Sequence, residues 1–317
     1  MTSSDAFLRR RRDLMSLAEP GSVLVVPGAR EQLRNGDSHF AFRQDSDFLY
    51  LTGFEEPDAV LVLVPGRDAG EQLLFCREKD PDRERWDGPR LGLAAARERL
   101  AVDDAFPIED LDEILPGLME GRERIYHAVG RDPSFDRQVI EWRNRLRRQK
   151  RNVRAPEDFI GLEHLLHELR LVKSADELKC MRRAAKISAN AHARAMRACR
   201  PGRTEAELTA ELTYEFTRHG CPASYLPIVA GGANALILHY VKNDQPLPDD
   251  GLVLIDAGCE VEGYAADISR TFPVTGRFTP AQRAVHDVVY AAQRAAIDRA
   301  RPGNVFDDIH DTACRVL

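Results

Sequence analysis

The chain has 317 residues, of which 43% are hydrophobic and 30% are charged, and its formal net charge is −6. This length predicts two domains, and this composition is typical of a globular protein with sizeable apolar cores. The mild acidic excess argues against a general nucleic-acid partner. Because no apolar run approaches the roughly 18 residues that span a bilayer, we expect no membrane partner either.

The cysteines indicate the compartment. They are scattered singly, without the Cys-x-x-Cys spacing of a zinc site, at Cys76, Cys180, Cys199, Cys221, Cys259 and Cys314. This usage argues against a disulfide framework and favours a reducing cytosol. The first twelve residues contain a basic run with no apolar segment behind it, so we expect no signal peptide and predict a cytoplasmic protein.

The first half of the chain alternates between apolar runs and amphipathic stretches. The predicted strands are 22–27, 59–64, 71–76 and 125–129, and the predicted helices are 5–16, 91–100 and 108–118. This alternation is typical of an α/β domain of about 150–170 residues. The basic run from Arg143 to Arg154 follows, and we interpret it as a solvated connection between two domains, with a patch that binds a partner as the alternative.

The second half begins with helical patterns and then turns to strands. The predicted helices are 157–169, 174–199, 204–219 and 280–300, and the predicted strands are 226–230 and 236–240. Ser174 with Glu177, and Thr204 with Glu207, have the spacing of helix capping boxes.

A short internal repeat lies in this half. The order helix, Arg-Pro-Gly, helix occurs around 200–202 and again 101 residues further along, around 301–303. Such a repeat suggests a domain built of two similar halves around a shared site. Since the chain ends at Leu317 in the second helix of the second copy, we expect half of this domain to be missing.

Two aspartates define the most informative segment. Asp256 follows the apolar run Leu252 to Ile255, and Asp267 follows the polar segment Glu260 to Gly263. If the intervening turn is centred between Val261 and Glu262, the two aspartates face each other, with Cβ atoms about 4.5–5.5 Å apart. Carboxylates this close repel unless a cation lies between them, which makes the hairpin a candidate metal site. Two solvated aspartates beside a turn give the same local pattern.

Histidines offer a second set of candidates. His239 ends the apolar run before the hairpin, where it is either a hydrogen-bonded core residue or a group that donates a proton or steadies an oxyanion. His164 and His167 lie three residues apart on a predicted helix. The leucines between them indicate ordinary packing rather than a metal site.

Five segments carry a family resemblance. The run from Ile255 to Val274, with Asp256 and Asp267 eleven residues apart, resembles the two-aspartate motif of proline-specific peptidases with the pita-bread fold. Residues 234–240 resemble the histidine strand of that family. Residues 42–57 and 85–92 resemble the N-terminal domain of bacterial Xaa-Pro aminopeptidases, and residues 169–178 resemble the linker into their catalytic domain.

The resemblance implies an α/β N-terminal domain over residues 1–168 and an α+β pita-bread (creatinase/aminopeptidase-like) catalytic domain, truncated, over residues 169–317. It implies metal-dependent release of the N-terminal residue from peptides with proline second. Asp256 and Asp267 would be ligands of two divalent cations, most commonly Mn²⁺, which suits oxygen donors. His239 would support the substrate or intermediate. The family also suggests a homo-oligomer formed through the N-terminal domain, with Trp86 bordering a neighbour's site.

The chain departs from the family pattern in one respect. The family completes its metal site with a histidine and two glutamates from the second half of the domain, which this chain does not contain. We therefore expect the chain alone to bind metal weakly and to lack peptidase activity. Two other readings stay open: a prolidase that cuts only dipeptides, and a non-catalytic pita-bread module that binds peptides or proteins.

Overall fold

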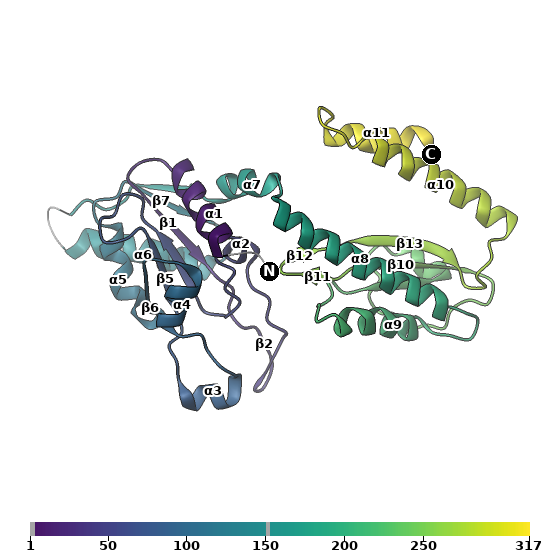
Figure 1. Ribbon diagram of the computed structural model, residues 1–317, viewed down its shortest axis with the longest axis horizontal. Coiled ribbons are helices and arrows are strands. Elements are labelled where there is room, and N and C mark those ends of the chain that lie inside the picture. The colour runs from purple at the N-terminus through teal and green to yellow at the C-terminus, as the bar shows by residue number, and fades with distance from the viewer. Residues whose placement is uncertain (1–3, 150–152) are drawn as a thin grey trace. The chain divides into compact units, whose positions relative to one another are not determined.

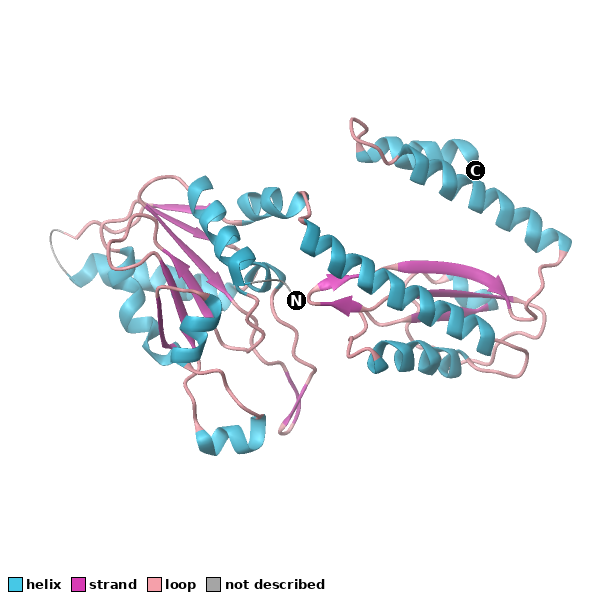
Figure 2. Ribbon diagram, in the orientation of Figure 1, coloured by secondary structure: helices cyan, strands magenta, loops and turns pink. Residues whose placement is uncertain are grey.

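The computed structural model describes residues 4–149 and 153–317 and divides into two compact units, Met1–Leu178 and Lys179–Leu317 (Figure 1). Both units combine helices and strands (Figure 2). None of the described helices combines the length and the apolar character needed to cross a membrane.

The first unit is built on a six-stranded mixed sheet of order β6-β5-β4-β1-β7-β8. Its strands are β1 (Ser22–Pro27), β4 (Val60–Leu63), β5 (Gln72–Cys76), β6 (Asp104–Pro107), β7 (Arg124–His127) and β8 (Asp158–Gly161). β1 pairs in parallel with β7 and antiparallel with β4. The central strands are continuous apolar runs because both faces of the sheet are covered.

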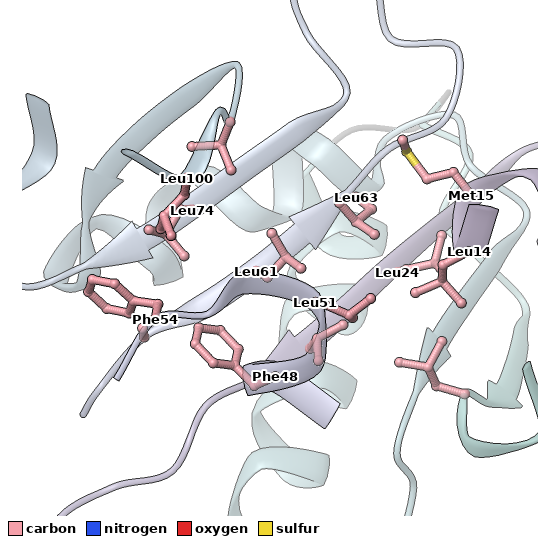
Figure 3. Close-up of a cluster of buried hydrophobic side chains, with 14 of the residues drawn as sticks. Leu14, Met15, Leu24, Phe48, Leu51, Phe54, Leu61, Leu63, Leu74 and Leu100 are labelled. Carbon is pink, nitrogen blue, oxygen red and sulfur yellow. The ribbon is translucent and has the colours of Figure 1, made fainter. Parts of the chain in front are cut away.

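Helices cover both faces of this sheet. The helices that supply buried side chains are α1 (Ser4–Leu17), α2 (Ser46–Thr52), α4 (Leu93–Leu100), α5 (Leu111–Met119), α6 (Pro133–Gln149) and α7 (Glu163–Leu171), whereas α3 (Pro81–Asp87) has no buried residue. On one face Leu24 and Leu61 pack against Leu14, Phe48 and Leu100 (Figure 3). Side chains from α5 and α6 pack on the other face. The remaining short elements are β2 (Leu33–Asn35), β3 (Ser38–His39) and η1 (Ile108–Asp110).

A buried arginine joins two helix ends in the first core. Arg11, on α1, is fully buried. Its guanidinium donates to the carbonyl oxygens of Leu51 (2.9 Å), at the end of α2, and of Leu100 (2.7 Å) and Ala101 (3.1 Å), at the end of α4, and to Gln72 Oε1 (2.6 Å). Burial lowers the pKa of Arg11 to about 10, so the side chain remains charged at neutral pH. This cation satisfies carbonyls that helix ends leave unpaired.

The interpretation of the basic run as an interdomain connection is wrong. Arg143 to Gln149 belong to α6, residues 150–152 lie outside the described residues, and β8 then joins the same sheet as β7. Arg143 Nε donates to the Pro156 carbonyl oxygen at 2.9 Å, so the run folds back onto its own unit. The predicted helix 157–169 is in fact β8 followed by α7. β8 is a mostly exposed edge strand of four residues, which is too short to give a strand pattern.

The second unit has a three-stranded antiparallel sheet of order β13-β10-β9. Its strands are β9 (Ile228–Gly231), β10 (Leu252–Ala257) and β13 (Ile268–Pro273), with α8 (Ala175–Ala198) and α9 (Glu205–Arg218) packed on one face. Both predicted capping boxes are present, because the backbone N–H groups of Ser174 and Thr204 each donate to the glutamate three residues later at 2.8 Å.

A second helix pair follows the sheet. α10 (Pro280–Arg299) and α11 (Phe306–Val316) pack against each other. Each pair, α8 with α9 and α10 with α11, is joined through an Arg-Pro-Gly turn, at 200–202 and 301–303. The repeated order of elements predicted from the sequence is therefore confirmed.

Candidate metal centre

The strand pairing decides which face of the small sheet carries Asp256. Directly opposite residues in antiparallel strands lie on the same face. Asp256, on β10, pairs with Ile228 on β9 and with Ser269 on β13. Val253 and Ile255, the alternate residues of β10, pack against α8 and α9. Asp256 therefore projects from the face that these two helices leave uncovered.

The predicted centre of the hairpin is wrong by one residue. The turn is made by Glu262 and Gly263, which have φ values of 52° and 83° and join β11 (Glu260–Val261) to β12 (Tyr264–Ala265). Asp256 consequently lies opposite Ser269, and Asp267 lies two residues before Ser269. Since alternate residues share a face, Asp267 is a diagonal neighbour of Asp256 on the same face. A glutamate in the left-handed region is uncommon, so local preference does not place the turn at Glu262.

The two aspartates meet at one hydroxyl group that sequence reasoning missed. The Tyr225 hydroxyl donates a short hydrogen bond to Asp256 Oδ1, and its oxygen lies 3.1 Å from Asp267 Oδ1. Burial, together with both carboxylates, raises the pKa of Tyr225, so the phenol stays protonated. Tyr225 precedes β9, whose Ile228 pairs with Asp256. Only the pairing register could have revealed the contact.

The charges around this hydroxyl fit a divalent cation. A tyrosine has one proton to donate, so it cannot satisfy two carboxylates at once. Across residues 4–149 and 153–317, neither Asp256 nor Asp267 forms an ion pair with a basic side chain. Two adjacent oxygen ligands without a counter-charge suit a hard divalent ion. The described residues contain no cluster of three or more histidine, cysteine or acidic side chains, so they supply only part of a coordination sphere.

His239 does not lie on a strand, contrary to the prediction for residues 236–240. A short helix, η2 (Gly232–Leu236), is followed by a turn in which His239 is exposed. The apolar run misled the prediction because its leucines are exposed. Tyr240 packs beside Ile228 and Ala230, and Ile228 is the pairing partner of Asp256. The His239 loop therefore covers the same face of the sheet as the two aspartates.

A buried histidine lies behind the hairpin. His192, on α8, donates from Nε2 to the carbonyl oxygen of Ile268 at 2.8 Å, one residue after Asp267. Burial, followed by the nearby Arg270, lowers the pKa of His192, so the neutral ring is favoured. His164 and His167, the pair of histidines considered in the sequence, lie on α7 in the first unit. His164 Nδ1 is 2.7 Å from the Gly161 carbonyl oxygen.

Comparison with known proteins agrees with this architecture. The family model described as Metallopeptidase family M24 matches residues 179–317, and that of the aminopeptidase P N-terminal domain matches residues 7–126. The Xaa-Pro aminopeptidase of Escherichia coli K12 is 43% identical over 318 residues, which cover 99% of this chain and 72% of the relative. This chain belongs to the Xaa-Pro aminopeptidase family.

Solved structures of Xaa-Pro aminopeptidases share the fold. Pseudomonas aeruginosa aminopeptidase PepP has a TM-score of 0.98 at 51% identity, and the match covers 99% of this chain and 72% of that one. Zn-substituted E. coli aminopeptidase P in complex with product has a TM-score of 0.96 at 43% identity, with the same coverage. The expected α/β N-terminal domain and pita-bread catalytic domain are confirmed. The chain is a metallo-aminopeptidase whose family uses divalent metal ions.

Proposed function

We propose that this Xaa-Pro aminopeptidase releases the N-terminal residue from peptides with proline in second position, and that Asp256 and Asp267 hold its divalent cations. The observation that carries the metal assignment is the convergence of both carboxylates on the single Tyr225 hydroxyl, without a basic partner among the described residues. Two carboxylates held together in this way are stabilised by a cation.

Manganese is the cation we propose, because an all-oxygen pair of ligands suits Mn²⁺ and Mg²⁺ better than a thiolate-loving ion. When bound, such ions polarise the scissile carbonyl group and lower the pKa of the attacking water. The protein's own side chains set the geometry. Tyr225 holds the two carboxylates side by side, and His192 holds the backbone next to Asp267.

His239 is the group we propose for contact with the substrate. Its loop covers the carboxylate face, and its ring is exposed, so a bound peptide can reach it. A histidine there can donate a proton or a hydrogen bond to the oxygen that becomes negative as the peptide bond is attacked. We expect His239→Ala to lower kcat more than it weakens substrate binding.

The metal assignment is tested by calorimetric titration of the 317-residue chain with Mn²⁺. Asp256→Asn and Asp267→Asn keep the side-chain shape but remove the negative charge, and we expect each to weaken binding at least about tenfold. The matched control is Asp249→Asn, which alters an exposed loop carboxylate of the same unit. Equal Mn²⁺ affinity in all three variants would show that the two aspartates do not bind the metal.

The number of ligands limits what these residues can do by themselves. Because the described residues offer two carboxylates and no larger metal-binding cluster, we propose that residues 1–317 alone bind Mn²⁺ weakly and do not turn over peptide. The assay follows release of the N-terminal residue from a tripeptide with proline second, beside the same tripeptide with alanine second. Turnover at the rate of an ordinary enzyme would overturn this proposal.

We also propose a cytoplasmic homo-oligomer. All six cysteines lie within the described residues and are unpaired, as expected in a reducing compartment. Trp86, on α3, is 88% exposed, and none of the described residues 81–87 is buried. An exposed tryptophan on a short projecting helix is typical of a contact surface. Sedimentation of Trp86→Ala tests this: smaller oligomers than the wild type are expected, and identical sedimentation argues against the contact.

A further inference from the structure

A buried glutamate lies beneath the loop that carries His239. Glu205 is the first residue of α9, and it is completely buried. A carboxylate buried without a counter-charge is costly unless donors occupy its lone pairs. Four groups donate to it. The backbone N–H of Gly231 (2.8 Å) and Asn234 Nδ2 (2.9 Å) reach Oε1, while the Tyr240 hydroxyl (2.8 Å) and the backbone N–H of Gln245 (3.0 Å) reach Oε2.

All four donors belong to one segment, the loop 231–245. Gly231 ends β9, Asn234 lies in η2, Tyr240 directly follows His239, and Gln245 lies in the return to β10. The Gln245 carbonyl oxygen also accepts from the Glu205 backbone N–H at 2.9 Å, and Asn234 Nδ2 lies 3.1 Å from the Tyr240 hydroxyl. One carboxylate therefore holds the start, the middle and the end of the loop.

The hydrogen bond between Tyr240 and Glu205, in the middle of the loop, is the contact that bears on the reaction. The Tyr240 ring packs on Ile228 and Ala230, on the face that carries Asp256, while its hydroxyl reaches down to Glu205. His239 is the neighbouring residue, and its side chain is exposed. Fixing Tyr240 at both ring and hydroxyl fixes the backbone from which His239 projects.

We infer that Glu205 is a positioning residue of this aminopeptidase, which acts through the loop 231–245 to hold His239 over the aspartate-bearing face. The inference rests on the substrate role proposed above for His239. The test variant is Glu205→Gln, which has nearly the same shape. Its amide nitrogen can only donate, so at least one pair of loop donors loses its acceptor. The matched control is Glu207→Gln, which removes an exposed capping-box carboxylate from the same helix turn.

The main experiment is a double-mutant cycle between Glu205→Gln and His239→Ala, made in a chain extended to the full length of its Xaa-Pro aminopeptidase relatives, of which residues 1–317 span 72%. We expect Glu205→Gln to lower kcat about 10- to 100-fold, since small displacements of a catalytic group have effects of this size. KM and Mn²⁺ affinity should stay within about twofold, because the metal-site residues Asp256 and Asp267 are held by other elements. In the His239→Ala background the same substitution should lower kcat by less than about threefold, because coupled residues are not additive.

Two further measurements distinguish a failure of the positioning role of Glu205 from a failure of the substrate role of His239. Tyr240→Phe removes one donor and leaves the ring in place, so it should lower kcat less than Glu205→Gln does. Hydrogen exchange of the amides in 231–245 should be faster in Glu205→Gln than in Glu207→Gln. An equal loss of kcat in both His239 backgrounds, or unchanged loop exchange in Glu205→Gln, would overturn the positioning role. If His239→Ala kept the full kcat while loop exchange was fast in Glu205→Gln, the role proposed for His239 would be wrong, although Glu205 would still hold the loop.

Discussion

Arg11 gives a stability prediction whose size can be worked out from its contacts. Arg11→Met keeps the aliphatic stem and removes the guanidinium, which leaves the oxygens of Leu51, Leu100, Ala101 and Gln72 without their donor. Buried hydrogen bonds to a charged group contribute about 1.5 kcal/mol or more each, so the gross loss is roughly 6 kcal/mol. Burial of the charged guanidinium, which also lowers the pKa of Arg11, has a desolvation cost of roughly 3 kcal/mol, and the methionine variant avoids this cost. The expected net destabilisation is about 3 kcal/mol.

Urea unfolding followed by tryptophan fluorescence measures this effect selectively. Both tryptophans, Trp86 and Trp142, belong to the first unit, and Trp142 lies in its core. The control is Arg12→Met, which alters the exposed neighbour on the same helix and should cost less than about 0.5 kcal/mol. Arg11→Lys should fall between the two, because an ammonium keeps the charge but cannot reach all four acceptors. A loss for Arg11→Met no larger than for Arg12→Met would refute the argument that the guanidinium holds the two helix ends.

Two further predictions concern the second unit. A Cβ on Gly258 would lie 1.8 Å from the Ala266 carbonyl oxygen, so Gly258→Ala should destabilise the hairpin by about 2–4 kcal/mol and weaken Mn²⁺ binding. Thermal unfolding and calorimetry test this beside Gly117→Ala, a helix position with open space that should be neutral or slightly stabilising. His192 has a folded-state pKa below its unfolded value of about 6.5, so its stabilisation is complete above that pH and decreases as the pH falls through it. His192→Asn, which can still donate to Ile268, should flatten the decline in stability between pH 7 and pH 5; an unchanged decline would exclude His192 as its source.

The sequence led to the right face of the sheet for Asp256 and Asp267, but to the wrong pairing register for the two strands that carry them. Asp256 and Asp267 were expected to face each other directly, yet they are diagonal neighbours because the turn lies one residue later. Side chains repeat every two residues along a strand, and moving the centre of a hairpin by one residue changes each pairing by two. The error therefore left both carboxylates on the same side. The displacement itself depends on Glu262 adopting a left-handed conformation, which local preference does not predict.

The errors at His239 and at the basic run share a physical cause. Local patterns report whether a segment has apolar residues, but not whether the fold buries them. Leu236 and Leu238 are each 86% exposed although they form an apolar run, and β8 pairs in the sheet although its residues are mostly exposed. Tyr225 was missed for a related reason. Its role arises from contacts with residues 31 and 42 positions away, which no local pattern encodes.

The difference between the two faces of β10 has a consequence for how substitutions act. In β10, Val253, Ile255 and Ala257 pack against helices, so changes there should act on folding. Leu254 and Asp256 occupy the intervening positions on the opposite face, where Leu254 packs beside Tyr240 under the His239 loop, so changes there should act on peptidase activity with less effect on folding. Adjacent codons in this strand would thus respond to different selective pressures. A deep mutational scan that measures abundance and peptidase activity separately should show the two kinds of sensitivity alternating residue by residue along β10.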